Sequence, residues 1–185
     1  MTTALVIIDL QNAILAGMAS PDRQREIDAA LDVTVARVAD VQTRARDANM
    51  PIVVVQHDGA PGHRLQVGTD GHGLRREIVP RSGEITVHKT ACDAFYGTDL
   101  QEVLAAQTVE HLIISGCMTQ FCVDTTVRRA VSLGYDVTLL SDGHTTADMG
   151  GLTFEQIIAH HNALLAGFDA GPRRVTLQTC AEVTF

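Results

Sequence analysis

The chain has 185 residues, 45% of them apolar and 19% charged, so we expect one globular domain over residues 1–185. The net charge is −8 and no concentrated Lys/Arg patch occurs, which argues against a nucleic-acid-binding surface. The apolar run Ala4–Ile8 is too short for a signal peptide or a membrane span. We therefore expect a cytoplasmic protein without membrane association, in which the four cysteines stay reduced.

Apolar segments of strand length alternate with helical patterns along the chain. The first of them is followed by an amphipathic stretch from Arg23 to Asn49, whose apolar residues recur at helical spacing until Asn49 and Pro51 end it. Several of the apolar segments are continuous, which is typical of strands that are covered on both faces. The strand candidates are Ala4–Ile8, Ile52–Val55, Ile85–His88, Leu112–Ser115, Val137–Leu140 and Val175–Leu177.

Later helices are marked by their start and stop signals. Thr98–Gln101 and Thr153–Gln156 both fit the capping-box pattern, and a further helix follows Cys122 and runs to Gly134. This β-α-β alternation predicts a three-layer, doubly wound α/β fold of the Rossmann-like type, with about six mainly parallel strands and helices on both faces. Residues 57–83 interrupt it with a long segment rich in glycine, and loops of that length are usually functional.

Cys122 is the strongest candidate for a nucleophile. It follows an apolar strand and a glycine turn, about where the next helix begins, among backbone N–H groups that have no partner within the helix. Such a position favours the thiolate, and a thiol pKa lowered to about 6 would make the thiolate the major form at neutral pH. We interpret Cys92, Cys117 and Cys180 as small buried apolar residues.

Three reactive side chains follow different strands. Asp9 ends the first strand, Lys89 ends the third, and Cys122 follows the fourth. Because ligands bind at the carboxyl ends of the strands in a doubly wound sheet, we expect these side chains to meet in one cleft. Each alone has a commoner explanation, namely a capping aspartate, a solvated lysine and a packed cysteine. Together a carboxylate, an ammonium and a thiol make a hydrolytic set.

Motifs in the same regions point to a family. They are Ile7–Asn12, His88–Lys89 followed by Ala94–Leu100, and Gly116–Val123 with the later Gly134–Tyr135. With these motifs, in this order, the chain resembles the isochorismatase-like cysteine hydrolases over nearly its full length. That superfamily includes nicotinamidases and N-carbamoylsarcosine amidohydrolases.

The resemblance implies specific roles. It implies a triad in which Asp9 is the general base and acid, Lys89 gives electrostatic support, and Cys122 forms a covalent thioester. It implies a cis peptide bond between Cys117 and Met118, with the backbone N–H groups of Met118 and Cys122 forming an oxyanion hole. It also implies a homo-oligomer, either a dimer or a tetramer.

We therefore expect a hydrolase that needs no cofactor and cleaves a C–N bond (amide, ureido or related) in a small-molecule substrate. Gln11 more readily organises the loop around Asp9 than contacts substrate, although we keep it among the candidates. The candidate substrate-binding residues are Gln11, His57, Phe95, Phe121 and His144.

Two alternatives stay open. Nicotinamidase-like relatives hold a metal on an Asp-x-His…His set after the second strand, and the stretch from His57 to His63 lacks that spacing, so we expect no metal. A metal-assisted amidase is nevertheless an alternative, because Asp58 and His72 add to the ligands of this loop. The other alternative is a catalytically silent small-molecule binder or thiol sensor on the same fold.

Overall fold

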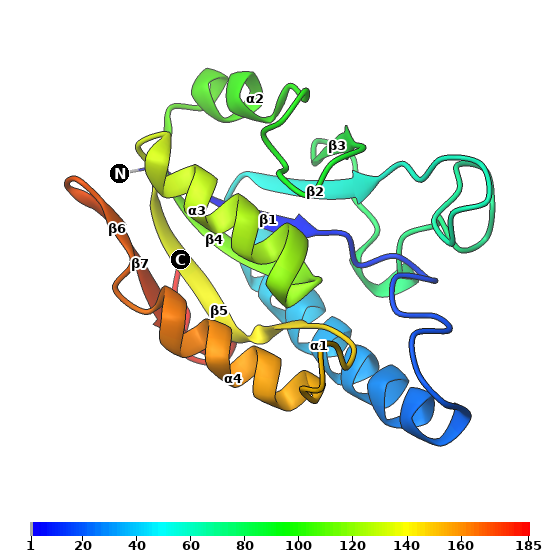
Figure 1. Ribbon diagram of the computed structural model, residues 1–185. Coiled ribbons are helices and arrows are strands. Elements are labelled where there is room, and N and C mark those ends of the chain that lie inside the picture. The colour runs from blue at the N-terminus through cyan, green and yellow to red at the C-terminus, as the bar shows by residue number, and fades with distance from the viewer. Residues whose placement is uncertain (1) are drawn as a thin grey trace.

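A seven-stranded sheet in the order β3-β2-β1-β4-β5-β7-β6 lies at the centre of the molecule (Figure 1). The computed structural model describes residues 2–185. All neighbouring strands are parallel except β6 and β7, which are antiparallel. The strands are β1 (Thr2–Ile8), β2 (Ile52–His57), β3 (Ile85–Lys89), β4 (Val109–Cys117), β5 (Asp136–Thr145), β6 (Asp169–Ala170) and β7 (Arg173–Gln178).

Apolar side chains from both faces of the sheet form two cores. On β1, Val6 and Ile8 pack into one core and Leu5 and Ile7 into the other, because successive side chains of a strand point to opposite faces. This explains why β1 is a continuous apolar run rather than an alternating one.

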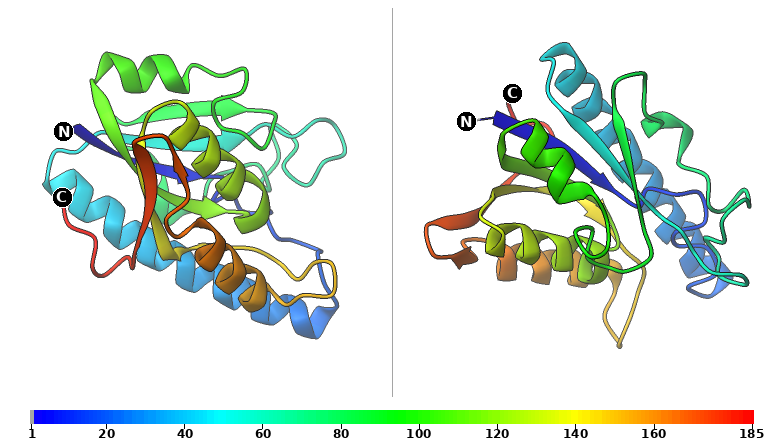
Figure 2. Two further views of the ribbon diagram at one scale, coloured as in Figure 1. Left: turned by 60° about the vertical axis from the view of Figure 1, so that its left-hand side comes forward. Right: turned by 90° about the horizontal axis from the view of Figure 1, so that it is seen from above.

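Helices cover these cores. The helix α1 packs in the core that holds Leu5 and Ile7, whereas α2 and α3 pack in the core on the other face. Figure 2 shows α1 and α3 on opposite sides of the sheet. No helix within residues 2–185 has the length and apolar character that crossing a bilayer requires. The helices are α1 (Pro21–Asp47), η1 (Arg76–Ile78, 3-10), α2 (Leu100–Ala106), η2 (Thr119–Val123, π), α3 (Asp124–Ser132) and α4 (Phe154–Leu165).

The predicted fold class is confirmed, and all six predicted strands are present. The short β6 was missed because two residues carry no apolar pattern. The capping box at Thr153 is confirmed, since its side chain and that of Gln156 each bond to the other's backbone. The capping box at Thr98 is wrong: α2 starts one residue later with Asp99 as its N-cap, and the Thr98 hydroxyl donates to the carbonyl of Ala94 instead.

The order of the strands creates a crevice between β1 and β4. The chain passes from β1 to β2 and β3 on one side, and then returns to place β4 on the other side of β1. Neighbouring connections therefore diverge at the carboxyl ends of β1 and β4, which is the place where doubly wound sheets bind ligands. Asp9 directly follows β1, and Cys117 is the last residue of β4.

Gly116 lies where β4 passes closest to β1. Its φ is +129°, and a Cβ at this position would lie 2.0 Å from the carbonyl oxygen of Ile8. Backbone atoms of a central strand cannot move aside without separating the two strands. Only glycine fits, and this brings the ends of β1 and β4 together at the crevice.

We predict that Gly116→Ala lowers the free energy of unfolding by about 3 kcal/mol or more, because it adds a steric clash to an unfavourable φ. Urea denaturation followed by circular dichroism measures this. The matched control is Gly68→Ala, whose φ is +83° but whose surroundings are open. Equal losses in the two variants would show that the contact with Ile8 is not the cause.

Candidate active site

Lys89 lies buried at the end of β3, with its ammonium between a carboxylate and a thiol. Nζ donates to Asp9 Oδ2 at 2.6 Å, to the carbonyl of Ala91 at 2.9 Å and to Cys122 Sγ at 3.3 Å. These bonds use all three N–H donors of an ammonium and so fix its position. The side chains of Lys89 and Asp9 are both 0% exposed, so water does little to weaken their attraction.

The fold positions each member of this group by a different device. Asp9 is the first residue after β1 and takes a φ of +51°, which ends the strand. Lys89 stands opposite His57 in the β2–β3 register. Cys122 lies in the π-helical turn η2, before α3 begins at Asp124, rather than at the start of an α-helix. The structure thus brings together the three residues that the sequence placed at one edge.

Burial and the neighbouring charges have opposing effects on the pKa values of the groups at this site. Burial raises the pKa of the Asp9 carboxyl, although the ammonium of Lys89 acts in the other direction. Burial lowers the pKa of Lys89, but the Asp9 carboxylate and the contacts with Asp9 and Cys122 together raise it overall, so the ammonium stays protonated. Burial and the Asp9 carboxylate raise the pKa of the Cys122 thiol above its usual value despite Lys89. This direction is opposite to the lowered thiol pKa expected from the sequence, and it favours the thiol over the thiolate.

A cavity of about 250 Å³ opens onto Asp9 and Cys122. Its walls are largely apolar, with basic side chains on one side. Larger hollows lie at the amino ends of β2 and β3 and between α1 and α4, away from Cys122. The residues that line the cavity are Asp9, Ile14, His57, His63, Arg64, Leu65, Cys92, Met118, Phe121 and Cys122.

The loop after β2 forms one wall of this cavity. It folds back on itself, since the backbone N–H of Gly59 donates to the carbonyl of Leu65 at 2.9 Å. Leu65 is only 1% exposed and anchors the loop in the core. The guanidinium of Arg64 donates from Nε to the carbonyl of Ile14 at 2.8 Å, which ties the loop to the segment after β1.

Gln11 binds the backbone of the same loop through its side chain. Its side chain is fully buried, and its Nε2 donates to the carbonyls of His57 at 3.0 Å and His72 at 2.8 Å. Its Oε1 accepts from the backbone N–H of His57 at 2.9 Å. Gln11 therefore organises the loop, and it does not line the cavity as a substrate-binding residue would.

His57 and Phe121, two of the candidate substrate-binding residues, both line the cavity. Burial, followed by the charge of Lys89, lowers the pKa of His57 to about 4, so its imidazole is neutral. Its Nδ1 lies 3.5 Å from Nζ of Lys89.

Phe95, His144 and Cys92 do not lie where the sequence suggested. Phe95 is buried and stacks on the ring of Tyr135 at a centroid distance of 5.9 Å, so it belongs to the core. His144 is 2% exposed and fills an internal position beside η2. Cys92 was predicted to be buried, but it is exposed and lines the cavity, because it lies in the loop after β3 and not in an element.

Residues 3–160, most of the chain, match the family model described as the Isochorismatase domain. The chain belongs to the isochorismatase family.

Other members of the isochorismatase family are similar to this chain. Streptothricin hydrolase from Streptomyces noursei is 35% identical over 147 residues, which are 79% of this chain and 50% of that protein, so the chain spans half its length. Ureidoacrylate amidohydrolase RutB from Variovorax paradoxus strain S110 is 27% identical over 183 residues, covering 83% of this chain and 72% of that protein. A crystal structure of an isochorismatase family protein superposes with a TM-score of 0.79 at 35% identity, covering 96% of this chain and 98% of that one.

The segment Gly116–Val123, one of the motifs that carry the resemblance to the family, spans the end of β4 and the π-helical turn η2. The peptide bond between Cys117 and Met118 is cis, as the resemblance implied. Met118 and Cys122 both line the cavity, whereas Cys117 is buried.

Sequence reasoning missed the cavity residues Arg64, Leu65 and Ile14 and gave His63 no place in the substrate site. One signal for them was present: Leu65 is one of the few large apolar residues within a polar, glycine-rich loop, which indicates a point where the loop is anchored. His63 and Arg64, which precede Leu65, could not be placed at the cavity from the sequence. Their position depends on the hydrogen bond between Arg64 and the carbonyl of Ile14, and no local sequence pattern predicts that contact.

His144 makes the stability of the fold depend on pH. Its Nδ1 lies 2.9 Å from the hydroxyl of Thr119 and its Nε2 2.9 Å from Oδ1 of Asn162, and burial lowers its pKa to about 4. The folded pKa lies below the unfolded value of about 6.5, so protonation favours unfolding. The contribution of neutral His144 to the free energy of unfolding is therefore fully present above the unfolded pKa, and it is lost as the pH falls toward 4.

We predict that His144 accounts for a loss of about 3 kcal/mol in the free energy of unfolding across this interval. Urea denaturation at several pH values measures it. His144→Gln should give a shallower pH dependence, whereas the exposed His160→Gln should keep that of the wild type. An unchanged dependence in His144→Gln would refute the assignment.

Proposed function

We propose that this protein hydrolyses an amide-type C–N bond of a small molecule through a covalent thioester on Cys122. The observation that carries the proposal is the placement of one buried ammonium, Lys89, within hydrogen-bond distance of both Asp9 and Cys122 at a cavity. The related proteins named as a hydrolase and an amidohydrolase support the reaction class.

In the first step Asp9 removes the thiol proton while Sγ of Cys122 attacks the substrate carbonyl. Oδ2 of Asp9 is bound by Lys89, whereas Oδ1 has no hydrogen-bond partner among residues 2–185, so we assign Oδ1 as the proton acceptor. Because the pKa of the thiol is raised, transfer during the attack avoids accumulating a buried thiolate. The raised pKa of Asp9 makes it a stronger base than an exposed carboxylate.

The oxyanion then forms beside the backbone N–H groups of Met118 and Cys122, where one such donor typically contributes about 3 to 4 kcal/mol. Asp9 gives its proton to the leaving nitrogen as the C–N bond breaks, and the C–S bond of the thioester remains. A water molecule, deprotonated by Asp9, attacks this thioester. The C–S bond breaks, and the proton returns to sulfur.

The charges around the cavity indicate which small molecules fit. Lys89 and Arg64 carry two positive charges against the one negative charge of Asp9. The cavity of about 250 Å³ therefore favours a small substrate with an oxygen-rich or anionic group near Arg64. A ureido acid has this chemistry, and a relative named ureidoacrylate amidohydrolase supports testing that class first.

The residues that line the cavity give little support to the metal-assisted alternative. Of the loop residues that offer ligands, His57 and His63 line the cavity but Asp58 and His72 do not. The loop adds no carboxylate to the lining of the cavity, whereas an Asp-x-His…His set needs one beside its histidines. The mechanism therefore uses only side chains of the chain itself.

We predict that Cys122→Ala lowers kcat by about a thousandfold or more, because no other group there forms the thioester. Ammonia release from a panel of small amides and ureido acids measures turnover, and mass spectrometry of trapped protein locates the acyl adduct. Cys180→Ala is the matched control, a buried thiol outside the cavity that should retain activity. Undiminished turnover in Cys122→Ala would sink the mechanism, and oxidation of Cys122 without turnover of any amide would favour the thiol-sensor alternative.

We predict that kcat/KM is lost on acidification at a pH above the usual aspartate value of about 3.9, because Asp9 must be ionised and its pKa is raised. Lys89→Met should lower kcat and move this acidic limb upward by about one pH unit or more, since the charge that favours ionised Asp9 is gone. Profiles of kcat/KM against pH for both proteins measure the shift. If Lys89→Met kept near-normal turnover and the same acidic limb of the kcat/KM profile, this role for Lys89 would be excluded.

A further inference from the structure

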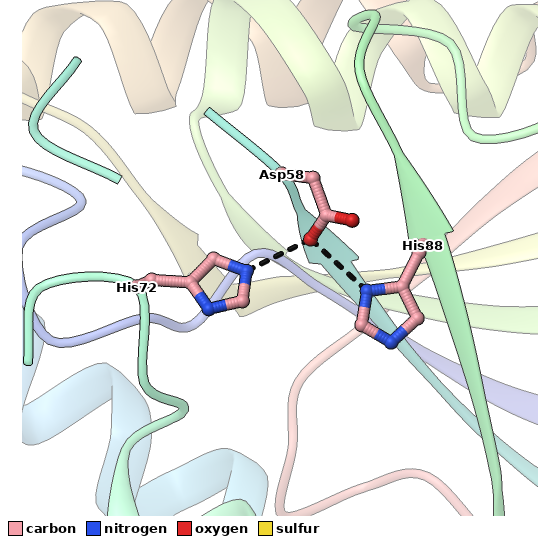
Figure 3. Close-up of side chains that lie close together, drawn as sticks. All are labelled: Asp58, His72 and His88. Carbon is pink, nitrogen blue, oxygen red and sulfur yellow. Dashed lines mark hydrogen bonds and ion pairs between the residues drawn. The ribbon is translucent and has the colours of Figure 1, made fainter. Parts of the chain in front are cut away.

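Asp58, His72 and His88 meet at the edge of the sheet formed by β2 and β3 (Figure 3). Oδ1 of Asp58 lies 2.8 Å from Nε2 of His72 and 3.0 Å from Nδ1 of His88. The three side chains are 29%, 14% and 53% exposed, in that order, so solvent reaches the group. Two imidazoles and a carboxylate therefore converge from three separate parts of the chain.

This group is separate from the cavity that holds Cys122. His57 and Lys89 are register partners, and both approach the catalytic group. His88 precedes Lys89 on β3, where side chains of successive residues point to opposite faces of the sheet, and Asp58 directly follows the end of β2. None of Asp58, His72 and His88 lines the cavity.

The distances suit a metal ion. Ligand atoms about 2.0 to 2.2 Å from a tetrahedral zinc ion lie about 3.3 to 3.6 Å apart. The two N···O separations of 2.8 and 3.0 Å are only about half an ångström shorter than this, and all three ligand atoms lie within 4.8 Å of one another. Small side-chain rotations would bring the three atoms to these distances, and the ring of His88 is half-exposed.

The backbone of His72 is fixed before any ion binds. Its carbonyl accepts from Nε2 of Gln56 at 2.9 Å and from Nε2 of Gln11 at 2.8 Å. The backbone N–H of Asp58 donates to the carbonyl of Lys89 at 2.8 Å. Ligands held in place by surrounding hydrogen bonds bind metal more tightly than free ones.

We propose that Asp58, His72 and His88 bind a divalent transition-metal ion such as Zn²⁺, at a site outside the catalytic cavity. Two imidazoles with one carboxylate select zinc, cobalt or nickel over magnesium and calcium, which prefer oxygen ligands. Water completes the coordination. The site differs from a nicotinamidase-like metal site after β2, because His88 comes from β3 and none of the three residues lines the cavity that holds Cys122.

The ion would fasten the long loop to the sheet. His72 belongs to the loop between β2 and β3, whereas His88 belongs to β3 at the edge of the sheet. Binding to the folded chain alone stabilises it by mass action. The proposal does not depend on the catalytic role of Cys122.

The test uses the full chain carrying Cys92→Ala and Cys122→Ala, which removes the cavity thiols as competing ligands, after treatment with a chelator. Titration with Co²⁺ followed by visible absorption, and with Zn²⁺ followed by calorimetry, should give one equivalent bound. His88→Ala and His72→Ala should each weaken binding by at least about tenfold. Zn²⁺ should raise the Tm of the starting protein and leave that of His88→Ala unchanged.

The controls separate this site from other histidines. His63→Ala removes a cavity imidazole and His160→Ala an exposed one, and both should bind metal like the starting protein. Circular dichroism establishes that each variant is folded, and His88→Gln serves as a second variant at the half-exposed position. The proposal fails if no ion binds at millimolar concentration, or if binding survives in both His72→Ala and His88→Ala.

Discussion

The buried ion pair between Lys89 and Asp9 is the interaction on which the site depends. Both side chains lie out of contact with water, so each requires the other: removing one partner of such a pair leaves an uncompensated charge and typically costs about 3 to 5 kcal/mol. The pair joins the end of β3 to the end of β1, with β2 between them. The same ammonium reaches the thiol that follows β4, so one charge determines the geometry of the whole group.

This charge also bears on the proposed chemistry. Because burial and the nearby carboxylate raise the thiol pKa, the proposed mechanism transfers the proton during the attack rather than starting from a preformed thiolate. A basic carboxylate beside a protonated thiol is suited to a reaction in which the proton must later reach a leaving nitrogen. The ammonium restrains the pKa of Asp9, so that the base is not neutralised by its own burial.

Much of this arrangement was predictable, and the reasons are local. Asp9, Lys89 and Cys122 could be placed together because parallel strands have their carboxyl ends at one edge, a rule that needs only the strand pattern. The thiol pKa could not, because it depends on how deeply η2 buries Cys122. Phe95 and His144 were misplaced because an aromatic or imidazole ring has the same sequence signature in a core as in a binding site. The contact between His88 and Asp58 was missed because it depends on the register of β2 and β3. Neither segment's own sequence predicts that register.

The buried Leu65 anchors a loop that shapes the cavity and is separate from the strands that carry Asp9, Lys89 and Cys122. The three proposed reacting groups lie at or after the ends of strands of the central sheet, whereas His63, Arg64 and Leu65 reach the cavity from a single loop that is anchored at one apolar residue. Mutation in that loop alters the shape and charge of the cavity without disturbing the ion pair or the thiol. Substrate range is therefore free to diverge in evolution while the reaction itself is conserved, as long as the anchoring leucine keeps the loop in place.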